Sequence, residues 1–235
     1  MGSSRLPGKV MKLGADKPLL GHLVERLLSS TVLEKVIIAT TTEERDETIV
    51  KYCGENGIPV FRGSENDVLD RYYQAARAFG VETIVRVTSD CPLIDTKLID
   101  ETLRTVLPQI DNYDLVTNRH PLTFIDGIDF DVIPIKSLEL AWQTAREKHQ
   151  REHVVPFFWD THLRVKNFDD PRQLFFSHRW TLDYQEDYEL ISAIYQHLYQ
   201  GNKLFETTDI LQLLSSHPEL MEINSKYLPK RPDSK

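Results

Sequence analysis

Apolar positions follow two different periods along this chain, and their alternation predicts its elements. Residues 20–28 carry leucine and valine at helical spacing, whereas residues 35–40 form a continuous run rich in β-branched side chains. The first pattern predicts a helix with one buried face, and the second predicts a strand buried on both sides. Further helices are expected near 43–53, 64–79 and 98–107, and further strands near 58–61, 82–88 and 113–117. This alternation predicts an α/β, Rossmann-like fold with a mainly parallel sheet and helices on both faces.

The pattern changes after residue 117. Residues 126–135 alternate polar with apolar side chains, which is typical of a half-exposed antiparallel strand. We expect residues 118–170 to form an antiparallel strand extension that lies over the site as a lid and also pairs with a second copy in a homodimer. A helix is then expected over 136–148, exposed strand structure over 163–168, a strand over 179–183 and a helix from about 184 to 199.

Composition narrows the class of protein. The chain has 235 residues, 40% hydrophobic and 27% charged, so one domain spanning 1–235 can bury its own core. Its formal net charge is -8 and its basic residues are scattered, which argues against nucleic acid or an anionic membrane as a partner. Cys53 and Cys91 form no CxxC, and no signal peptide or transmembrane run is visible. We therefore expect a cytoplasmic protein with reduced thiols.

The first ten residues concentrate anion-binding chemistry. They combine glycines, hydroxyl donors and fixed positive charge in a short span: Gly2, Gly8, Ser3, Ser4, Arg5 and Lys9. Such a segment predicts a phosphate-binding loop, although its spacing matches neither the Walker pattern nor G-x-G-x-x-G. The alternative is a purification-tag remnant, which residues 1–4 resemble and residues 5–9 do not.

Two aspartates come at the ends of predicted strands, where ligands bind in open α/β sheets. Asp90 follows the strand of residues 82–88, and Asp183 closes the strand of residues 179–183. The residues alone leave a local alternative open for each. Asp90 is also suited to an Asx turn or helix cap, and Asp183 to an N-cap completed by Glu186 in a capping box.

Two further polar clusters are compatible with either a functional or a purely structural role. Three aspartates lie in the alternating segment: Asp126, Asp129 and Asp131. Their spacing lacks the glycine and glutamate of an EF-hand, so solvated carboxylates on a strand face are expected from the residues alone. A guanidinium, a carboxylate and an imidazole precede an aromatic run: Arg151, Glu152 and His153. The structural alternatives for this cluster are an ion pair and a histidine at the edge of the core.

The N-terminal loop also carries a family resemblance. Its S-x-R-L-P-x-K wording, at residues 3–9, resembles the nucleotide-binding signature of the cytidylyltransferases that make CMP-activated acidic sugars, and is closest to the spore-coat-polysaccharide type. The resemblance covers nearly the whole chain. In that family a first strand ending Gln-Ala-Arg comes before the signature. This sequence starts at Met1, so we expect the domain without that strand.

The resemblance implies roles for particular residues. Asp90 and Asp183 are implied to be the ligands of one Mg²⁺ ion. The implied nucleotide-binding set comprises the loop residues and one strand-end carboxylate: Ser3, Ser4, Arg5, Lys9 and Asp90. The implied catalytic set is Arg5, Lys9, Asp90 and Asp183. Sequence similarity to family members in the second half of the chain also implies a set of residues near the acidic acceptor: Asp126, Asp129, Arg151, Glu152, His153 and Arg179.

The activity expected from this resemblance is Mg²⁺-dependent transfer of CMP from CTP to an acidic sugar, with release of pyrophosphate, for surface polysaccharide or glycoconjugate synthesis. Catalysis would come from positioning and electrostatics, with His153 and His178 as candidate general bases. Two alternatives stay open. One is a nucleotidyltransferase that uses another NTP and a sugar phosphate, and the other is a catalytically inactive nucleotide-binding or assembly subunit.

Overall fold

The structure is a computed structural model that describes residues 1–201 and 203–230. The expected domain, 1–235, therefore includes residues 202 and 231–235, which lie outside the described residues. The helices, in chain order, are α1 (Leu19–Leu28), α2 (Glu47–Glu55), α3 (Val68–Ala78), α4 (Thr96–Val106), α5 (Ile135–Thr144), α6 (Lys148–His153), α7 (Pro156–Asp160), α8 (Gln185–Leu198), α9 (Thr207–Ser216) and α10 (Pro218–Glu222). The described part of the chain has no helix long and apolar enough to cross a membrane.

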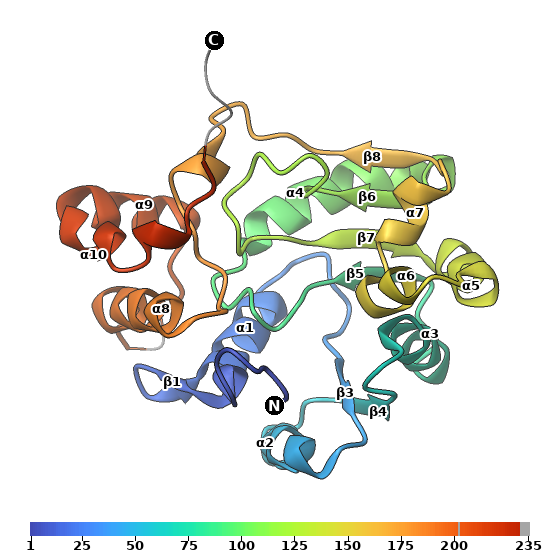
Figure 1. Cartoon of the computed structure of the whole chain (residues 1–235), viewed down its shortest axis with the longest axis horizontal. Helices are drawn as coiled ribbons and strands as arrows, with labels where there is room; N and C mark the ends of the chain where they lie inside the picture. The colour runs from blue at the N-terminus through green and yellow to red at the C-terminus, as the bar shows by residue number, and fades with distance from the viewer. Residues whose placement is uncertain (202, 231–235) are drawn as a thin grey trace.

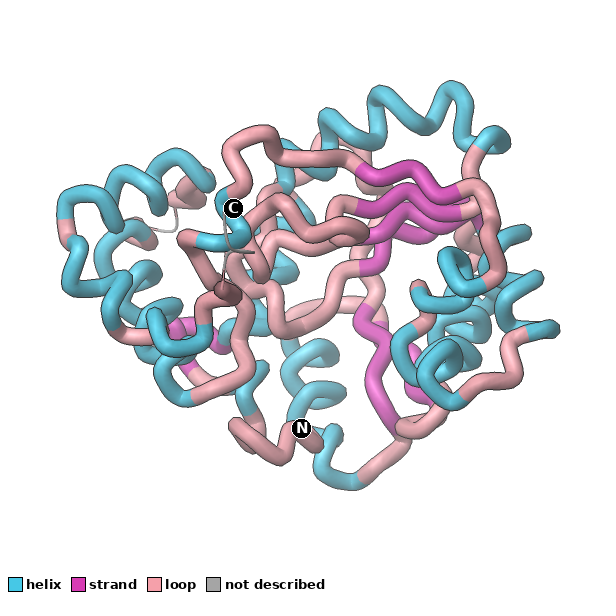
Figure 2. The backbone as a smooth tube through the Cα atoms, turned by 45° about the horizontal axis from the view of Figure 1, so that its top comes forward, coloured by secondary structure: helices cyan, strands magenta, loops and turns pink. Residues whose placement is uncertain are grey.

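The strands form two separate ladders, with β5 to β8 towards the upper right of Figure 1 and β3 with β4 towards the bottom, and a small N-terminal hairpin lies on the other side of α1. In chain order they are β1 (Leu13–Gly14), β2 (Lys17–Pro18), β3 (Ile38–Thr41), β4 (Val60–Gly63), β5 (Thr83–Arg86), β6 (Leu115–Thr117), β7 (Asp131–Pro134) and β8 (Val165–Asn167). The β3 and β4 strands are parallel, and the larger ladder has the order β5-β7-β6-β8. Figure 2 shows these four strands stacked together, with β3 set apart from them.

Helices cover both faces of the strands, and each face has its own core. The larger core collects buried side chains of α1, α4, α8 and α9 around Trp180 and Tyr195. The smaller core lies between β5 to β7 and helices α3, α5 and α7, with Phe158 and Leu138 fully buried in it. The expected α/β, Rossmann-like architecture with helices on both faces is confirmed.

The antiparallel strand lies in a different place from the one expected. Residues 126–130 are not in a strand, and β7 runs antiparallel between β5 and β6 inside the main ladder. Its first residue, Asp131, is fully buried because its carboxylate accepts hydrogen bonds from Arg86 (2.9 Å) and from the Thr117 hydroxyl (2.7 Å). The prediction of a half-exposed strand with solvated carboxylates is therefore wrong for Asp131, because the sequence pattern does not reveal these partners.

The segment expected to be a lid also contributes to the sheet. Within 118–170, β7 pairs with β5 and β6, and β8 pairs parallel with β6. Helices α6 and α7 connect these strands and border the candidate site described below. Whether this segment also pairs with a second copy stays a prediction.

The strand expected over 179–183 does not form. This segment is extended but forms no strand ladder. Two isolated backbone hydrogen bonds attach it to its neighbours: Trp180 N–H donates to the Asp126 carbonyl (2.7 Å) and Leu182 N–H donates to the Asp90 carbonyl (2.8 Å). Gly127 permits this approach, because a Cβ there would stand 2.4 Å from the Thr181 nitrogen and its φ of +113° is unfavourable for other residues. The expected carboxylate at the end of the segment is nevertheless placed beside Asp90.

Candidate active site

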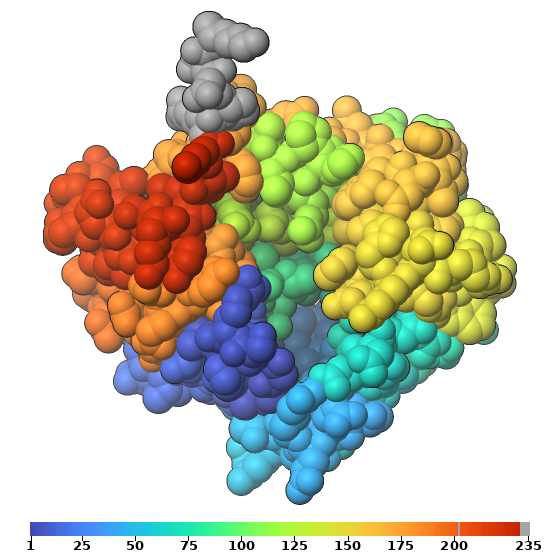
Figure 3. Space-filling view, viewed as in Figure 1, coloured from blue at the N-terminus to red at the C-terminus, as the bar shows by residue number. Residues whose placement is uncertain are grey.

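A polar cavity of about 460 Å³ opens where β5, β6 and the 180–183 segment end. In Figure 3 the face that it opens on is hollowed between the blue N-terminal segment and the yellow segment that contains α6 and α7. Four stretches of the chain supply its walls: Arg86, Thr88, Asp90, Arg119, Asp126, Asp129, His153, Val155, Pro156, Trp159, Thr181 and Asp183. The structure thus brings together five residues that the sequence singled out, namely Asp90, Asp126, Asp129, His153 and Asp183.

The N-terminal loop is anchored so that its cations reach the edge of this cavity. Leu6 and Val10 are buried in the larger core, and the Leu6 N–H donates to the Ser3 hydroxyl at 3.2 Å. Gly8 has a φ of +67°, which turns the chain between the two anchors. Ser4 is exposed, so its side chain is accessible to a ligand.

Lys9 joins Asp90 and Asp183. Its Nζ lies 2.9 Å from Oδ1 of Asp183 and 3.6 Å from Oδ2 of Asp90, and it also donates to the Leu182 carbonyl at 2.6 Å. The Lys9 side chain is 14% exposed, so little water screens these contacts. The N-terminal loop, Asp90 and Asp183 therefore meet at the Lys9 ammonium.

Arg5 reaches the same aspartate from the solvent side. Its guanidinium lies 3.1 Å from Oδ1 of Asp183, donates to the Tyr184 hydroxyl at 3.2 Å and stacks over the Tyr184 ring. The hydrogen bond from Arg5 to Tyr184 and the charge of Asp183 raise the pKa of Arg5. The Arg5 side chain is 51% exposed, so it remains accessible to an anionic ligand.

Asp183 is not the cap of the helix that follows it. The helix α8 is capped by Asp187, whose Oδ2 accepts hydrogen bonds from the N–H groups of Asp183 and Tyr184, each at 3.0 Å. The predicted N-cap role of Asp183 with Glu186 is therefore wrong, because the capping carboxylate comes one position later. This leaves the Asp183 carboxylate free to face Lys9 and Arg5.

Arg179 forms ion pairs with three aspartates at the site. It pairs with Asp126 at 2.7 Å, with Asp187 at 3.1 Å and with Asp183 at 3.5 Å. Its side chain is 11% exposed, and the hydrogen bonds and charges of these partners raise its pKa despite the opposing effect of burial. Arg179 does not line the cavity, so the structure places it as a support for the carboxylates.

The carboxylates of the site differ in electrostatic environment. Burial alone would raise the pKa of Asp183, but the hydrogen bond and charge of Lys9, with the charges of Arg5 and Arg179, lower it. Burial raises the pKa of Asp126 against the opposing charge of Arg179. Burial also raises the pKa of Asp129, to about 7, and its Oδ1 has no hydrogen-bond partner among the described residues. Asp183 is therefore a firm anion, and Asp129 is poised to be neutral or charged near pH 7.

Three cavity residues that the sequence reasoning did not single out add charge and shape. Arg86 and Arg119 bring guanidinium groups to the walls, and Trp159 brings an indole ring that is stacked on His120. Arg119 lies two residues beyond the end of β6, so the strand-end argument used for Asp90 also applies to it. Arg86 had a signal as well, since it is a charged residue inside an otherwise apolar strand.

Three candidate residues lie away from the cavity. Arg151 pairs with Asp67 at 2.7 Å and donates to backbone carbonyls of Trp142 and Ala145. Glu152 is exposed and His178 lies beside the Trp180 ring, and neither lines the cavity. A direct role for Arg151 and Glu152 in acceptor binding stays a prediction, and so does the role of His178 as general base. Of the two candidate bases only His153 lines the cavity.

The donor set fits a magnesium ion that shares its ligands with a nucleotide. The described residues contain no group of three or more His, Cys, Asp or Glu side chains that forms a complete metal site. Two half-buried carboxylates, Asp90 and Asp183, instead converge on the single cation Lys9 Nζ. Mg²⁺ is commonly held by one or two carboxylates together with phosphate oxygens and waters, so this pair suits it.

Comparison with known proteins decides the family. A protein-family model described as "Cytidylyltransferase" matches residues 1–210. The chain belongs to the cytidylyltransferase family. The loop residues, the two strand-end aspartates and the cavity between them all lie within the matched range.

This cytidylyltransferase is also similar to individual known proteins over nearly its whole length. It is 36% identical to an uncharacterized protein of Methanocaldococcus jannaschii, over 97% of this chain and 93% of that one. It is 32% identical to the spore coat polysaccharide biosynthesis protein SpsF of Bacillus subtilis, over 93% and 92% of the two chains. A solved cytidylyltransferase of Leptospira borgpetersenii superposes with a TM-score of 0.88 at 31% identity, over 99% and 95%.

Proposed function

We propose that this cytidylyltransferase moves CMP from CTP to a sugar that carries a carboxylate, and releases pyrophosphate. The observation that supports this most strongly is the convergence of Lys9 with Asp90 and Asp183 at the mouth of the cavity. In the proposed reaction an acceptor hydroxyl oxygen bonds to the α-phosphorus. The bond from that phosphorus to the β-phosphate oxygen breaks, and pyrophosphate leaves with its electron pair. The hydroxyl proton passes to His153 or to water.

The phosphate side of the reaction belongs to the N-terminal loop. Arg5 and Lys9 hold two positive charges close to Asp183, within a partly water-excluded space. Fixed cations of this kind stabilise the charge that develops on the leaving pyrophosphate. Asp90 and Asp183 would hold Mg²⁺, which when bound neutralises phosphate charge and orients the phosphate oxygens. The Lys9 ammonium, which now satisfies both carboxylates, is then available to the phosphates.

The acceptor sugar is proposed to bind to Arg119 and Trp159, which line the cavity. No described carboxylate forms an ion pair with the Arg119 guanidinium, whereas Arg86 already pairs with Asp131 at 2.9 Å. A guanidinium without an ion pair and an indole ring that line one cavity suit a sugar ring with a carboxylate, because the sugar ring can pack on Trp159 and its carboxylate can pair with Arg119. The polysaccharide role named for the Bacillus subtilis relative supports an acceptor destined for surface polysaccharide. A homodimer built through residues 118–170 remains part of this proposal.

Pyrophosphate release tests the proposal. The purified chain is assayed with each NTP in turn, with Mg²⁺, over a panel of acidic sugars and sugar phosphates. The proposal expects turnover with CTP and an acidic sugar. Turnover with another NTP and a sugar phosphate would replace it with the other nucleotidyltransferase chemistry. Failure of every combination, with the protein folded, would favour an inactive nucleotide-binding subunit.

A further inference from the structure

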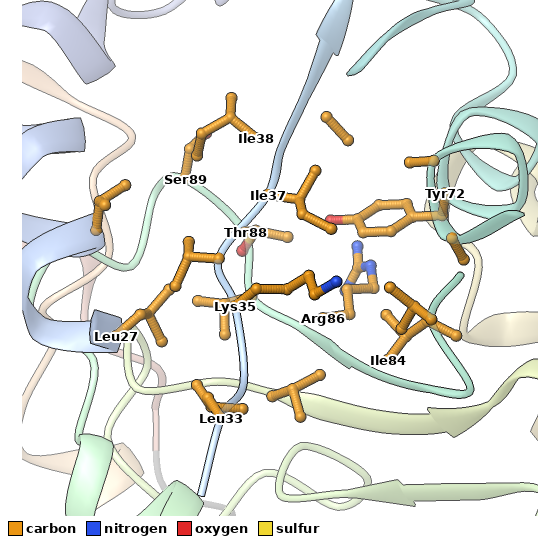
Figure 4. Close-up of a pocket in the computed structure, with 18 of the residues that line it drawn as sticks. Leu27, Leu33, Lys35, Ile37, Ile38, Tyr72, Ile84, Arg86, Thr88 and Ser89 are labelled. Carbon is orange, nitrogen blue, oxygen red and sulfur yellow. The ribbon is translucent and has the colours of Figure 1, made fainter. Parts of the chain in front are cut away.

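Two arginines at the polar cavity lie against tyrosine rings, but they differ in how firmly they are held. Figure 4 looks into a larger, mainly apolar cavity between β3 and β5 and shows the Arg86 guanidinium beside the Tyr72 ring, whose centroid is 5.5 Å away. Arg86 is also buried and pairs with the buried Asp131 at 2.9 Å. The Arg5 side chain is half exposed, and its guanidinium lies 4.9 Å from the centroid of the Tyr184 ring. Because burial does not fix Arg5, its orientation depends on that of Tyr184.

The backbone and the ring of Tyr184 are held by different parts of the chain. Its N–H donates to the Asp187 carboxylate at 3.0 Å, which fixes the backbone at the start of α8. Its ring is stacked on the ring of Tyr227, with the centroids 4.0 Å apart and the two planes inclined by 6°. The Tyr184 side chain cannot rotate without losing this near-parallel contact, so Tyr227 restrains the ring on which Arg5 depends.

The residues around Tyr227 are anchored to the same support that holds the aspartates. Asn224 is 3% exposed, and its amide donates to the Arg179 carbonyl at 3.0 Å and to Oδ1 of Asp187 at 2.9 Å. A short 3₁₀ turn, Ser225–Tyr227, follows it. Residues three positions apart lie on the same side of such a turn, so the anchoring amide of Asn224 and the ring of Tyr227 both face the segment before α8.

The ring stack is the main link between this turn and Tyr184. The Tyr227 hydroxyl donates to Oε2 of Glu186 at 3.1 Å, and the Lys226 ammonium pairs with the other oxygen of the same carboxylate. The Lys226 side chain is 60% exposed, so its ion pair contributes little. Two tyrosine rings in contact exclude water from a larger area, and their stacking adds to the energy of that burial.

We infer that the turn at residues 224–227 positions Arg5 for the nucleotide. Tyr227 fixes the Tyr184 ring, and the ring and hydroxyl of Tyr184 fix the Arg5 guanidinium against Asp183. Tyr227 does not line the polar cavity, so it is a positioning residue that acts through Arg5. The turn lies beyond residues 1–210, which the family model matches. That Arg5 in turn holds the phosphates of CTP rests on the proposed function.

The affinity for CTP tests this role without an acceptor sugar. Binding of CTP with Mg²⁺ is measured by isothermal titration calorimetry. Tyr227→Ala should weaken it by roughly three- to tenfold, the scale of one lost aromatic contact. Tyr227→Phe keeps the ring and loses only the hydroxyl, so its affinity should stay within about twofold of the parent chain. Ser225→Ala is the matched control, because it changes the same turn at a hydroxyl that donates to the Glu222 carbonyl. It should bind CTP like the parent chain.

A double-mutant cycle shows whether Tyr227 acts through Arg5. In a chain that carries Arg5→Gln, the further change Tyr227→Ala should have little effect on CTP affinity, because the group that it positions has already been removed. Equal losses from Tyr227→Ala with and without Arg5→Gln would overturn the proposed role of Tyr227. Affinity of the Tyr227→Ala chain equal to that of the parent chain would overturn it as well.

The mobility of the Arg5 side chain gives a second readout that needs no ligand. Relaxation of the ¹⁵N-labelled Arg5 Nε–H group is measured by NMR in the ligand-free chains. Its order parameter should fall in Tyr227→Ala and stay at the parent value in Tyr227→Phe and Ser225→Ala. A parent chain that binds no CTP would contradict the proposed function, and this order parameter would still decide the role of Tyr227. An Arg5 side chain as ordered in Tyr227→Ala as in the parent chain would overturn that role.

Discussion

The Lys9 ammonium lies 2.9 Å from the Asp183 carboxylate, although 174 positions separate them in the sequence. This contact fastens the N-terminal loop to the segment before α8, and Asp90 lies on the other side of the same ammonium at 3.6 Å. Two carboxylates from separate segments of the chain and the N-terminal loop thereby form one site. The account of function depends on this convergence.

Lys9→Met should abolish most turnover while the protein remains folded. The substitution keeps the length of an unbranched side chain and removes the charge that faces both aspartates and the phosphates. Loss of one positioned donor of this kind costs roughly 10²–10³ in kcat. Steady-state pyrophosphate release measures the effect. Lys12→Met is the matched control, since Lys12 stacks on Tyr188 and does not line the cavity. Similar losses in both variants would count against the role of Lys9.

Asp90→Asn and Asp183→Asn should each raise the Mg²⁺ concentration needed for half-maximal turnover and lower the maximum. Neutralising a metal ligand removes charge without opening a cavity, so the melting temperature should change little. Titration of activity with Mg²⁺ measures this. Asp111→Asn, at an exposed position outside the cavity, should behave like the parent chain. An unchanged Mg²⁺ requirement in both site variants would remove Asp90 and Asp183 as the metal pair.

Asp187→Ala should destabilise the fold. The Asp187 carboxylate is fully buried, caps α8 and binds Arg179 and the Asn224 amide. Removing one partner from a buried charged network costs roughly 3–5 kcal/mol of unfolding free energy. Urea unfolding measures the loss. Glu189→Ala, at an exposed position of the same helix, should cost under about 0.5 kcal/mol. A loss for Asp187→Ala as small as that of the control would show that the network is not stabilising.

Asp129 should make stability depend on pH between its unfolded and folded pKa values. Burial raises the folded pKa from 3.8 to about 7, so the native state binds the proton more tightly than the unfolded state in this window. The contribution of Asp129 to the unfolding free energy therefore falls as pH rises from about 4 to 7, and then levels off. Asp129→Asn removes this slope. The stability of the variant relative to the parent chain should rise across that window in urea unfolding, and a constant difference would contradict the assignment.

Arg119→Gln should weaken acceptor binding more than nucleotide binding. The guanidinium is the proposed partner of the acceptor carboxylate, so its loss should raise the KM for an acidic sugar by roughly tenfold or more and leave the KM for CTP nearly unchanged. Arg146→Gln is the control, because Arg146 is exposed at the end of α5 and bonds only backbone carbonyls there. Equal effects on both substrates would argue against this placement of the acceptor.

Much of this architecture could be predicted because the hydrophobic pattern carries it. The run at 35–40 and the helical spacing at 20–28 report burial directly, and the strands and helices up to residue 117 lie close to where those patterns place them. The strand expected at 179–183 failed for a physical reason. That segment is held by one backbone hydrogen bond to Asp126 and one to Asp90, and not by a strand ladder. Because these partners are far away in the sequence, the local hydrophobic pattern does not reveal them.

The candidate site was predicted in part for similar reasons. Asp90 and Asp183 come at the ends of extended apolar segments, which is compatible with a ligand edge, but the choice of a metal role over a helix cap or turn came from the family resemblance. Arg119 meets the same criterion after β6, and Arg86 was marked by its charge inside a strand, whereas Trp159 enters the cavity only through the packing of α7. Arg151 was placed near the acceptor by the resemblance; its guanidinium pairs with Asp67, and its role in acceptor binding stays a prediction.

The fate of a labelled phosphate tests the central claim most directly. The chain is incubated with Mg²⁺, an acidic sugar and CTP labelled either at the α- or at the γ-phosphate, and the products are separated. The account predicts that the α-label appears in the sugar product and the γ-label in pyrophosphate, with both lost in Lys9→Met. A γ-label in the sugar product, or turnover that requires another NTP and a sugar phosphate, would contradict it.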